Sequence, residues 1–136
     1  MMTVLIVDGQ GGRLGKQLVK EVRERFPQLS LMAVGTNSMA TESMLKAGAD
    51  RAATGENAVV VACRKADVII GPVGIVIADA LLGEVTPTMA KAVGQSEAVR
   101  ILLPSDKCDT FIAGVGSTGM SALVEDAMDK LASLLK

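Results

Sequence analysis

The chain has 136 residues, of which 49% are hydrophobic and 21% charged, and its formal net charge is −1. We therefore expect one domain over residues 1–136, and a nearly neutral chain has no electrostatic reason to bind nucleic acid or an anionic membrane. The absence of His, Tyr and Trp excludes Ser-His and Cys-His catalysis, His-based zinc sites and Tyr-Lys proton transfer.

No targeting or membrane segment stands out in the sequence. Thr3–Val7 is too short for the apolar core of a signal peptide, and Asp8 follows it directly. The longest apolar stretch, Val68–Leu82, contains a proline and an aspartate and falls short of a membrane span. Cys63 and Cys108 lack metal or redox spacing and are interpreted as buried small hydrophobic residues. We expect a cytoplasmic protein without a metal site.

Apolar runs alternate with helical patterns along the first half of the chain, which predicts parallel strands joined by crossover helices. The expected strands are Thr3–Val7, Leu29–Val34 and a weak one within Asp50–Thr54. The expected helices run from Leu14 to a stop at Pro27, from a cap at Asn37 or Ser38 to a stop at Gly48, and from Glu56 to Lys65.

The second half continues this pattern and adds one exception. The expected elements are a strand at Asp67–Ile70, a loop with a short helix at Gly71–Glu84, a helix from Thr86-Pro87 towards Ser96, a strand at Val99–Leu103, and a closing helix from Met120 to Leu135.

Thr110–Val115 is predicted to be a sixth strand. Only Ser105–Asp109 separates it from the fifth strand, which is too short a connection for a parallel crossover, so we expect an antiparallel edge strand. The fold class is α/β, a single Rossmann-like three-layer sandwich with a mostly parallel sheet of five to six strands.

A glycine-rich turn is predicted directly after the first strand, over Gly9–Gly15. Glycine allows the backbone to turn tightly and to approach an anion closely. The first N–H groups of the following helix point towards such an anion, and the helix dipole favours it. Arg13 and Lys16 lie near the positive end of the helix dipole, which disfavours cations, but both can bind a phosphate placed there. The segment is interpreted as a phosphate-binding turn, and the alternative is a turn whose glycines only pack the helix against the strand.

The glycine spacing excludes one nucleotide-binding motif and resembles another. A Walker A loop would need glycine at Gln10 and Ser or Thr at Gln17, so it is excluded. The strict G-x-G-x-x-G pattern starting at Gly9 fails at Leu14. The glycines do fit G-x-x-G-x-x-G, which resembles the variant in extended short-chain dehydrogenase-like and related Rossmann proteins.

Small or polar residues follow almost every predicted strand, and the carboxyl ends of parallel strands form one rim where ligands bind. After the second strand the usual ribose-binding Asp or Glu is absent, and Thr36 and Asn37 are expected to hydrogen-bond a sugar or a 2′-phosphate instead. Pro104-Ser105-Asp106 belongs to the same rim. The expected cofactor-binding residues are Asp8, Gly9, Gln10, Gly11, Gly12, Arg13, Leu14, Gly15, Gly35, Thr36, Asn37, Thr54, Gly55, Glu56, Asn57, Gly71 and Pro72.

The catalytic residues are unknown, and two carboxylates are the candidate acid and base, Asp8 and Glu56. Asp8 ends a central strand and is suited to Mg²⁺ or a ribose hydroxyl, but Asp-Gly is equally a common turn. Glu56 begins a helix, where the dipole stabilises a carboxylate in any case. Asp79 and Glu84 are weaker candidates.

Much of the sequence resembles a family of small bacterial proteins of unknown function, found mainly in anaerobic lineages of the Gram-positive type. The matching stretches are Val7–Val19, Val34–Val60, Asp67–Pro87 and the strand ending at Leu103-Pro104, and GTN, ATGEN and GEVTP are their specific strings. The resemblance implies a Rossmann-like fold of the NAD(P)-binding type and no particular reaction.

The sequence therefore predicts a nucleotide-binding protein whose expected cofactor is NAD(P), held at the Gly9–Gly15 turn. One alternative is an enzyme acting on a small phosphorylated substrate, with Asp8 and Glu56 as acid and base. Another is a non-catalytic regulatory or assembly subunit that self-associates through Val73–Leu82. We expect a homodimer in each case.

Overall fold

Five parallel strands form one sheet in the order β3-β2-β1-β4-β5. The computed structural model describes residues 2–105 and 109–135. Its strands are β1 (Thr3–Asp8), β2 (Ser30–Gly35), β3 (Arg51–Thr54), β4 (Val68–Pro72) and β5 (Val99–Leu103). The α/β three-layer class predicted from the alternating pattern is confirmed.

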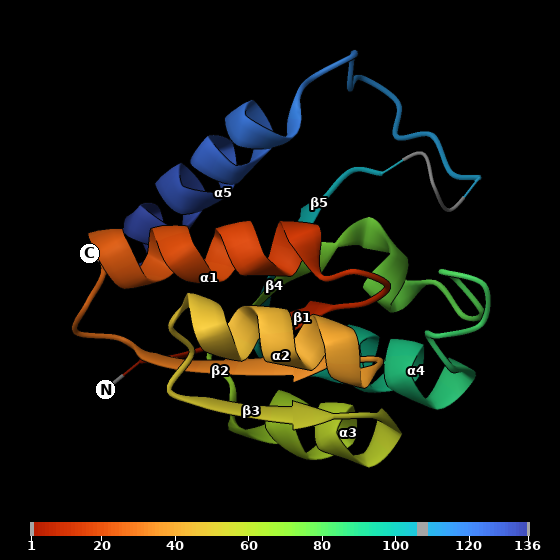
Figure 1. Cartoon of the computed structure of the whole chain (residues 1–136). Coiled ribbons are helices and arrows are strands. Elements are labelled where there is room, and N and C mark those ends of the chain that lie inside the picture. The colour runs from red at the N-terminus through yellow and green to blue at the C-terminus, as the bar shows by residue number, and fades with distance from the viewer. Residues whose placement is uncertain (1, 106–108, 136) are drawn as a thin grey trace.

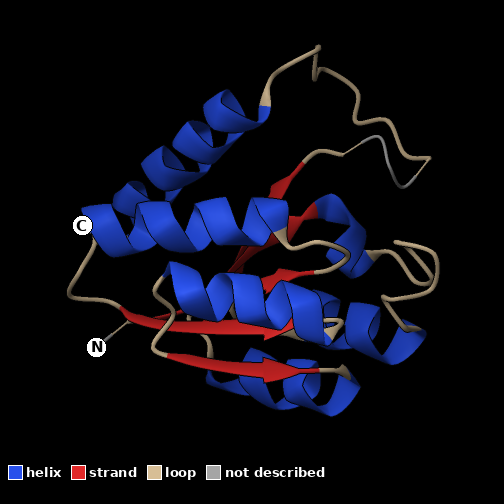
Figure 2. Cartoon of the chain, in the orientation of Figure 1, coloured by secondary structure: helices blue, strands red, loops and turns tan. Residues whose placement is uncertain are grey.

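Helices cover both faces of the sheet (Figures 1 and 2). One face carries α1 (Arg13–Arg25), α2 (Ser38–Ala47) and α5 (Met120–Leu134), and the other carries α3 (Glu56–Lys65), the 3-10 helix η1 (Val73–Val76) and α4 (Pro87–Gln95). In the part of the chain that the structure describes, no helix combines the length and the apolar character needed to cross a membrane.

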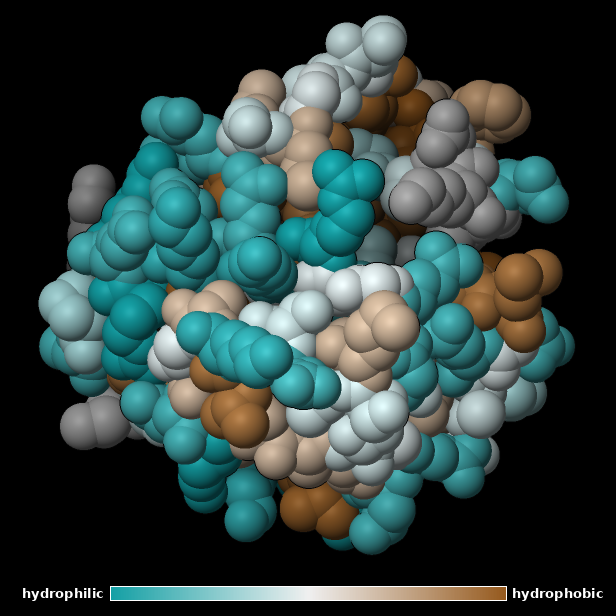
Figure 3. All heavy atoms as spheres, viewed as in Figure 1, coloured by the Kyte–Doolittle hydropathy of each residue, from teal (hydrophilic) through white to brown (hydrophobic). Residues whose placement is uncertain are grey.

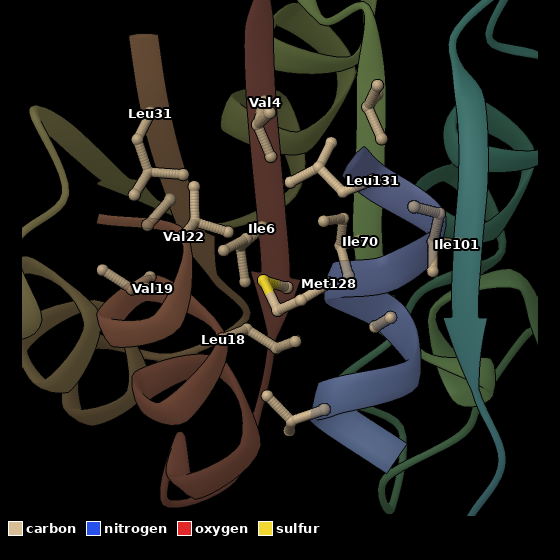
Figure 4. Close-up of a cluster of buried hydrophobic side chains, with 14 of the residues drawn as sticks. Val4, Ile6, Leu18, Val19, Val22, Leu31, Ile70, Ile101, Met128 and Leu131 are labelled. Atoms are coloured by element: carbon tan, nitrogen blue, oxygen red, sulfur yellow. The ribbon is translucent and has the colours of Figure 1, made fainter. Parts of the chain in front are cut away.

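The central strand β1 divides the hydrophobic core into two clusters. Val4 and Ile6 face α1 and α5, where they meet side chains such as Leu18 and Met128 (Figure 4). Leu5 and the other alternate residues face α3 and α4. Successive side chains of a strand point to opposite faces, so a strand covered on both sides must be apolar throughout. This explains the unbroken apolar run seen in the sequence.

Local capping signals set the helix ends where the sequence predicted them. The side chain of Asn37 accepts a hydrogen bond from the Ala40 N–H at 2.9 Å and begins α2. Thr86 does the same for the Met89 N–H at 3.1 Å and begins α4. Gly48, with φ of 126°, ends α2 in a conformation that other residues rarely adopt.

The predicted sixth strand at Thr110–Val115 is wrong. Residues 112–115 form a turn, closed by the Val115 N–H donating to the Ile112 carbonyl at 3.2 Å, and Thr110 and Phe111 before it belong to no strand. Gly114 has φ of 88°, and Asp109, just before the predicted strand, has φ of 50°. Both are left-handed backbone conformations that an extended strand does not allow. The chain crosses here from β5 to α5 instead, so the described sheet has no antiparallel edge.

The strand order places a crevice between two neighbouring strands. From β1 the chain moves outward through β2 to β3, and it then returns to the other side of β1 as β4 and β5. The connections next to β1 and β4 therefore diverge at the carboxyl ends of these strands. Ligands of open α/β sheets bind at such a reversal point.

Candidate functional site

The glycine-rich turn is held together by the carboxylate of Asp8, the last residue of β1. Asp8 Oδ1 accepts a hydrogen bond from the Gly9 N–H at 2.8 Å, and Oδ2 accepts one from the Gly15 N–H at 2.6 Å. The side chain is only 6% exposed. A buried carboxylate is tolerated when hydrogen bonds replace its lost hydration, so Asp8 ties the start of the turn to the first turn of α1.

Three of the four glycines in the turn are required by packing. A Cβ at Gly12 would lie 2.8 Å from the Ala40 Cα of α2, and Gly12 has φ of 72°. A Cβ at Gly15 would lie 2.6 Å from the Met44 Sδ, and one at Gly9 would overlap the Thr36 side chain. The glycines of the G-x-x-G-x-x-G pattern thus serve the close approach of the turn to its neighbours.

Gly11 is different from the other three glycines of the turn. It is exposed, and a Cβ built there meets no atom within 4 Å. Nothing in the described fold therefore requires glycine at position 11.

The beginning of α1 presents backbone donors to solvent. The Gly12 N–H donates to the Gly9 carbonyl, and the Lys16 N–H makes the first helical bond, to the Gly12 carbonyl. Within residues 2–105 and 109–135, the N–H groups of Gly11, Arg13 and Leu14 donate no hydrogen bond. The first turn of the helix carries no acidic residue. These three N–H groups belong to the positive end of the helix dipole, and the Asp8 carboxylate accepts hydrogen bonds from the donors of Gly9 and Gly15 instead.

A cleft of about 630 Å³ opens beside these donors, at the reversal point between β1 and β4. Its second wall is formed by residues 104–105, 110–112 and 115–118, which follow β5, together with Met120 and Leu123 of α5. The described residues before α5 lie above the start of α1 in Figure 1. Brown, hydrophobic atoms gather in the hollow beside this segment at the upper right of Figure 3. The described lining residues are Asp8, Gly9, Gln10, Gly11, Gly12, Arg13, Leu14, Pro72, Leu81, Leu103, Pro104, Ser105, Thr110, Phe111, Ile112, Val115, Gly116, Ser117, Thr118, Met120 and Leu123.

The carboxylate of Glu84, which was only a weak candidate acid or base in the sequence, lies on the β2 side of the turn. Its Oε1 accepts hydrogen bonds from the Gln10 N–H at 2.8 Å, the Thr36 hydroxyl at 2.7 Å and the Asn37 amide at 2.8 Å. The Asn37 amide also donates to the Gln10 carbonyl at 2.8 Å. We call these four residues the Glu84 clasp. The clasp joins the turn and the end of β2 to the loop before α4.

Partial burial of Glu84 opposes its ionisation, but the hydrogen bonds from Thr36, the Gln10 N–H and Asn37 outweigh it and hold the pKa of Glu84 below its usual value. A carboxylate whose pKa is lowered by folding stabilises the folded state fully above its unfolded pKa, which is about 4.3. This contribution is lost as the pH falls through the lower pKa of the folded state.

Glu84→Gln is expected to lower the free energy of unfolding by about 1 kcal/mol at pH 7, because a charged acceptor becomes a neutral one. The variant is also expected to lose less stability than the wild type as the pH falls below about 4.3. Urea unfolding between pH 3 and pH 7 measures both effects. Glu42→Gln, at an exposed position of α2, is the control and should follow the wild type. Equal pH profiles for wild type and Glu84→Gln would contradict the clasp.

The structure separates the predicted site residues into groups. Asp8 to Leu14 and Pro72 line the cleft, and Gly15 lies buried beneath the turn. Thr36 and Asn37 belong to the clasp, next to Gly35. Gly71 lies within β4, where a Cβ would overlap the Val7 carbonyl oxygen. Of the strand end at 104–106, Pro104 and Ser105 line the cleft and Asp106 lies outside the described residues.

The predicted loop at residues 54–57 does not line the cleft. Thr54 Oγ1 lies 2.6 Å from Thr41 Oγ1, and Glu56 Oε1 accepts a hydrogen bond from the Thr86 hydroxyl at 2.6 Å. Glu56 therefore joins the starts of α3 and α4, with Gly55 and Asn57 beside it.

Of the two cysteines, Cys63 is buried in the core between β4 and the helices α3 and α4, as predicted. Burial raises the pKa of the Cys63 thiol to about 11, so it stays protonated at neutral pH. Cys108 lies outside the described residues.

Sequence reasoning missed the wall that follows β5. Phe111, Ile112 and Val115 were assigned to a strand, and the hydroxyls of Ser117 and Thr118 were not considered. The available signal was the combination of apolar side chains with Gly, Ser and Thr, which is unusual for a buried strand.

No curated protein matches the chain. Solved structures that match include the crystal structure of a dodecameric FMN-dependent UbiX-like decarboxylase from Escherichia coli O157:H7. It is 18% identical, with a TM-score of 0.49, and the match covers 95% of this chain and 76% of that one. The likeness is too low to carry an argument about function. The family model described as Domain of unknown function (DUF3842) matches residues 3–136. The chain therefore belongs to the DUF3842 family, a family of unknown function as its sequence strings indicated.

Proposed function

We propose that this protein binds a phosphate-bearing small molecule of the nucleotide class in the cleft, with the phosphate at the beginning of α1. The observation that carries the proposal is the set of available N–H donors at Gly11, Arg13 and Leu14, all of which line the cleft. Backbone donors at a helix start form a preorganised anion site, because they point outwards together with the positive end of the helix dipole.

The charges around the cleft favour the same ligand. Arg13 is the one cationic side chain among the described lining residues, and it lies in the first turn of α1. Among the described lining residues Asp8 is the one acid, and its two oxygens accept hydrogen bonds from the turn. Arg13 and the N–H donors of the first turn of α1 are the groups that suit a phosphate.

NAD(P) remains a prediction within this class. The residues expected to hold its ribose, Thr36 and Asn37, instead hold Glu84. Glu84 supplies, from a distant loop, a carboxylate at the end of β2, where dinucleotide-binding proteins carry their ribose-binding acid. Oε1 of Glu84 already accepts hydrogen bonds from three donors. The ribose of a dinucleotide must therefore displace one of these donors or bind the other carboxylate oxygen of Glu84.

The two alternative functions receive less support from the geometry. Asp8 braces the turn, and Glu56 does not line the cleft, so the two carboxylates do not form an acid–base pair there. Within Val73–Leu82, side chains such as Ile75 and Leu81 pack inside the chain, while Leu82 is 99% exposed. The homodimer stays a prediction, as does any reaction.

Gly11→Val tests the proposal without disturbing the fold. The new side chain enters open space, so the melting temperature should stay close to that of the wild type. A bound phosphate would need that space, so we expect at least a tenfold loss of affinity for phosphate-bearing ligands. The measurement is a calorimetric titration and thermal-shift series with NAD⁺, NADP⁺, FMN, AMP, ATP and inorganic phosphate. A ligand at a hundredfold excess over its Kd should stabilise the wild type by about 2.7 kcal/mol.

The control is Gly94→Ala, on the exposed side of α4 and away from the cleft, where a Cβ also meets open space. It should bind like the wild type. Absence of binding by every phosphate compound, or equal affinity of Gly11→Val and wild type, would refute the proposed function.

A further inference from the structure

The wall of the cleft that follows β5 exposes an unusual number of apolar side chains. Phe111 is 91% exposed, and Ile112, Val115 and Met120 are 40%, 45% and 39% exposed. All four line the cleft, opposite the start of α1. Apolar side chains gathered at one concave place mark a binding surface, because leaving them in water costs free energy. We call these four residues the apolar wall.

The rest of the lining divides into an apolar interior and neutral polar groups. Leu81, Leu103 and Leu123 contribute apolar surface to the cleft. Ser117 and Thr118, which follow Val115 closely in the sequence, also line the cleft and carry neutral hydroxyl groups. Among the lining residues that the structure describes, the charged ones are Asp8 and Arg13, both at the turn. The rest of the described lining is neutral and largely apolar.

We propose that the ligand is a single-phosphate compound with a flat, apolar ring system, whose ring packs against Phe111 while its phosphate binds the start of α1. This inference rests on the proposed function and narrows its ligand class. Among the described lining residues there is one cationic side chain, Arg13, and it lies at one helix start, so these groups can hold one phosphate. For the further phosphates of a triphosphate, or for an additional 2′-phosphate, the described lining offers no second cation.

The ring is inferred from the exposure of Phe111. A planar ring stacked on an aromatic side chain buries a large area on both partners and needs no hydrogen-bond donor. Ile112 and Val115 extend the same surface. Neutral hydroxyls beside it suit the hydroxyl groups of a sugar or the carbonyl groups of a ring.

Phe111→Ala separates the ring from the phosphate. Because the side chain is almost fully exposed, the melting temperature of the free protein should not change. Affinity for FMN and AMP is expected to fall about tenfold to a hundredfold, the effect of losing one stacked ring. Affinity for inorganic phosphate should be unchanged, and ATP should bind the wild type more weakly than AMP does. Met39→Ala, at a residue 65% exposed on α2 and outside the cleft, is the matched control.

Phe111→Trp provides a direct spectroscopic measurement, because the chain contains no Trp or Tyr. The new indole would be the only tryptophan, and its emission should shift to shorter wavelength when AMP covers it. Inorganic phosphate should leave the emission unchanged. Met39→Trp places the same reporter outside the cleft and should respond to neither compound.

The outcomes distinguish this inference from the proposed function. If phosphate binds but AMP and FMN bind no more tightly than phosphate, the ring is refuted and the phosphate site stands. If NAD⁺ or ATP binds at least tenfold more tightly than AMP and FMN, the single-phosphate class is refuted. If Phe111→Ala converts a dimer to a monomer in sedimentation and keeps wild-type affinity for AMP, the apolar wall joins two copies and the inference fails.

Discussion

Asp8→Ala is expected to lower the free energy of unfolding by about 3 kcal/mol, which is a large part of the stability of a domain of this size. The substitution removes the acceptor of two backbone N–H groups, those of Gly9 and Gly15, in a position that is 6% exposed. Each of these N–H groups loses a charge-assisted hydrogen bond. Because the position is buried, water replaces the lost acceptor poorly. Urea unfolding followed by circular dichroism measures the loss.

Asp67→Ala is the matched control for Asp8. Asp67 accepts one backbone hydrogen bond, from the Thr3 N–H at 2.7 Å, and it is exposed. Water can replace its carboxylate, so the cost should stay below about 1 kcal/mol. Similar losses for the two variants would mean that the Asp8 carboxylate does not brace the turn.

Gly12→Val is expected to lower the free energy of unfolding by about 3 kcal/mol. One part of this cost arises because a β-branched residue must adopt a left-handed backbone conformation, and the other because the new side chain overpacks the contact with α2. Gly12 has φ of 72°, and its Cβ would lie 2.8 Å from the main chain of α2 at Ala40. A backbone atom cannot move aside as a flexible side chain can. The helices α1 and α2 would therefore have to separate.

Gly11→Val is the partner experiment, because the same substitution one residue earlier meets no atom within 4 Å. Equilibrium unfolding should separate the two variants by at least about 2 kcal/mol. Equal unfolding midpoints would show that the turn tolerates side chains at both positions. The comparison also shows why loss of binding in Gly12→Val would be ambiguous, whereas loss in Gly11→Val reports on the ligand.

The site was only partly predictable from the sequence. The turn at Gly9–Gly15 was found because its strand, glycines and helix are contiguous, and its residues do line the cleft up to Leu14. Glu84 was underestimated because its partners lie far away in the sequence: Thr36 Oγ1 is 48 residues distant and the Gln10 N–H is 74. Periodicity and turn signals carry no information on such pairs.

The predicted strand at Thr110–Val115 failed for a related reason. A short run of apolar residues is a local signal, and it cannot tell whether a neighbouring strand is available to pair. In the folded chain these residues connect β5 to α5 on the opposite wall of the cleft, and their apolar side chains stay exposed.

The sequence by itself determined the order along the chain of the five strands of the sheet and of the helices around them, the cap at Thr86 and the position of the glycine-rich turn, and it narrowed the other cap to Asn37 or Ser38. Each of these depends on residues close together in the chain. Only the tertiary structure decided what surrounds the turn. Packing of α1 on α2 explains Gly12, the loop before α4 delivers Glu84, and the segment after β5 brings Phe111 opposite the start of α1. These contacts join distant parts of the chain, so they arise only when the sheet has assembled.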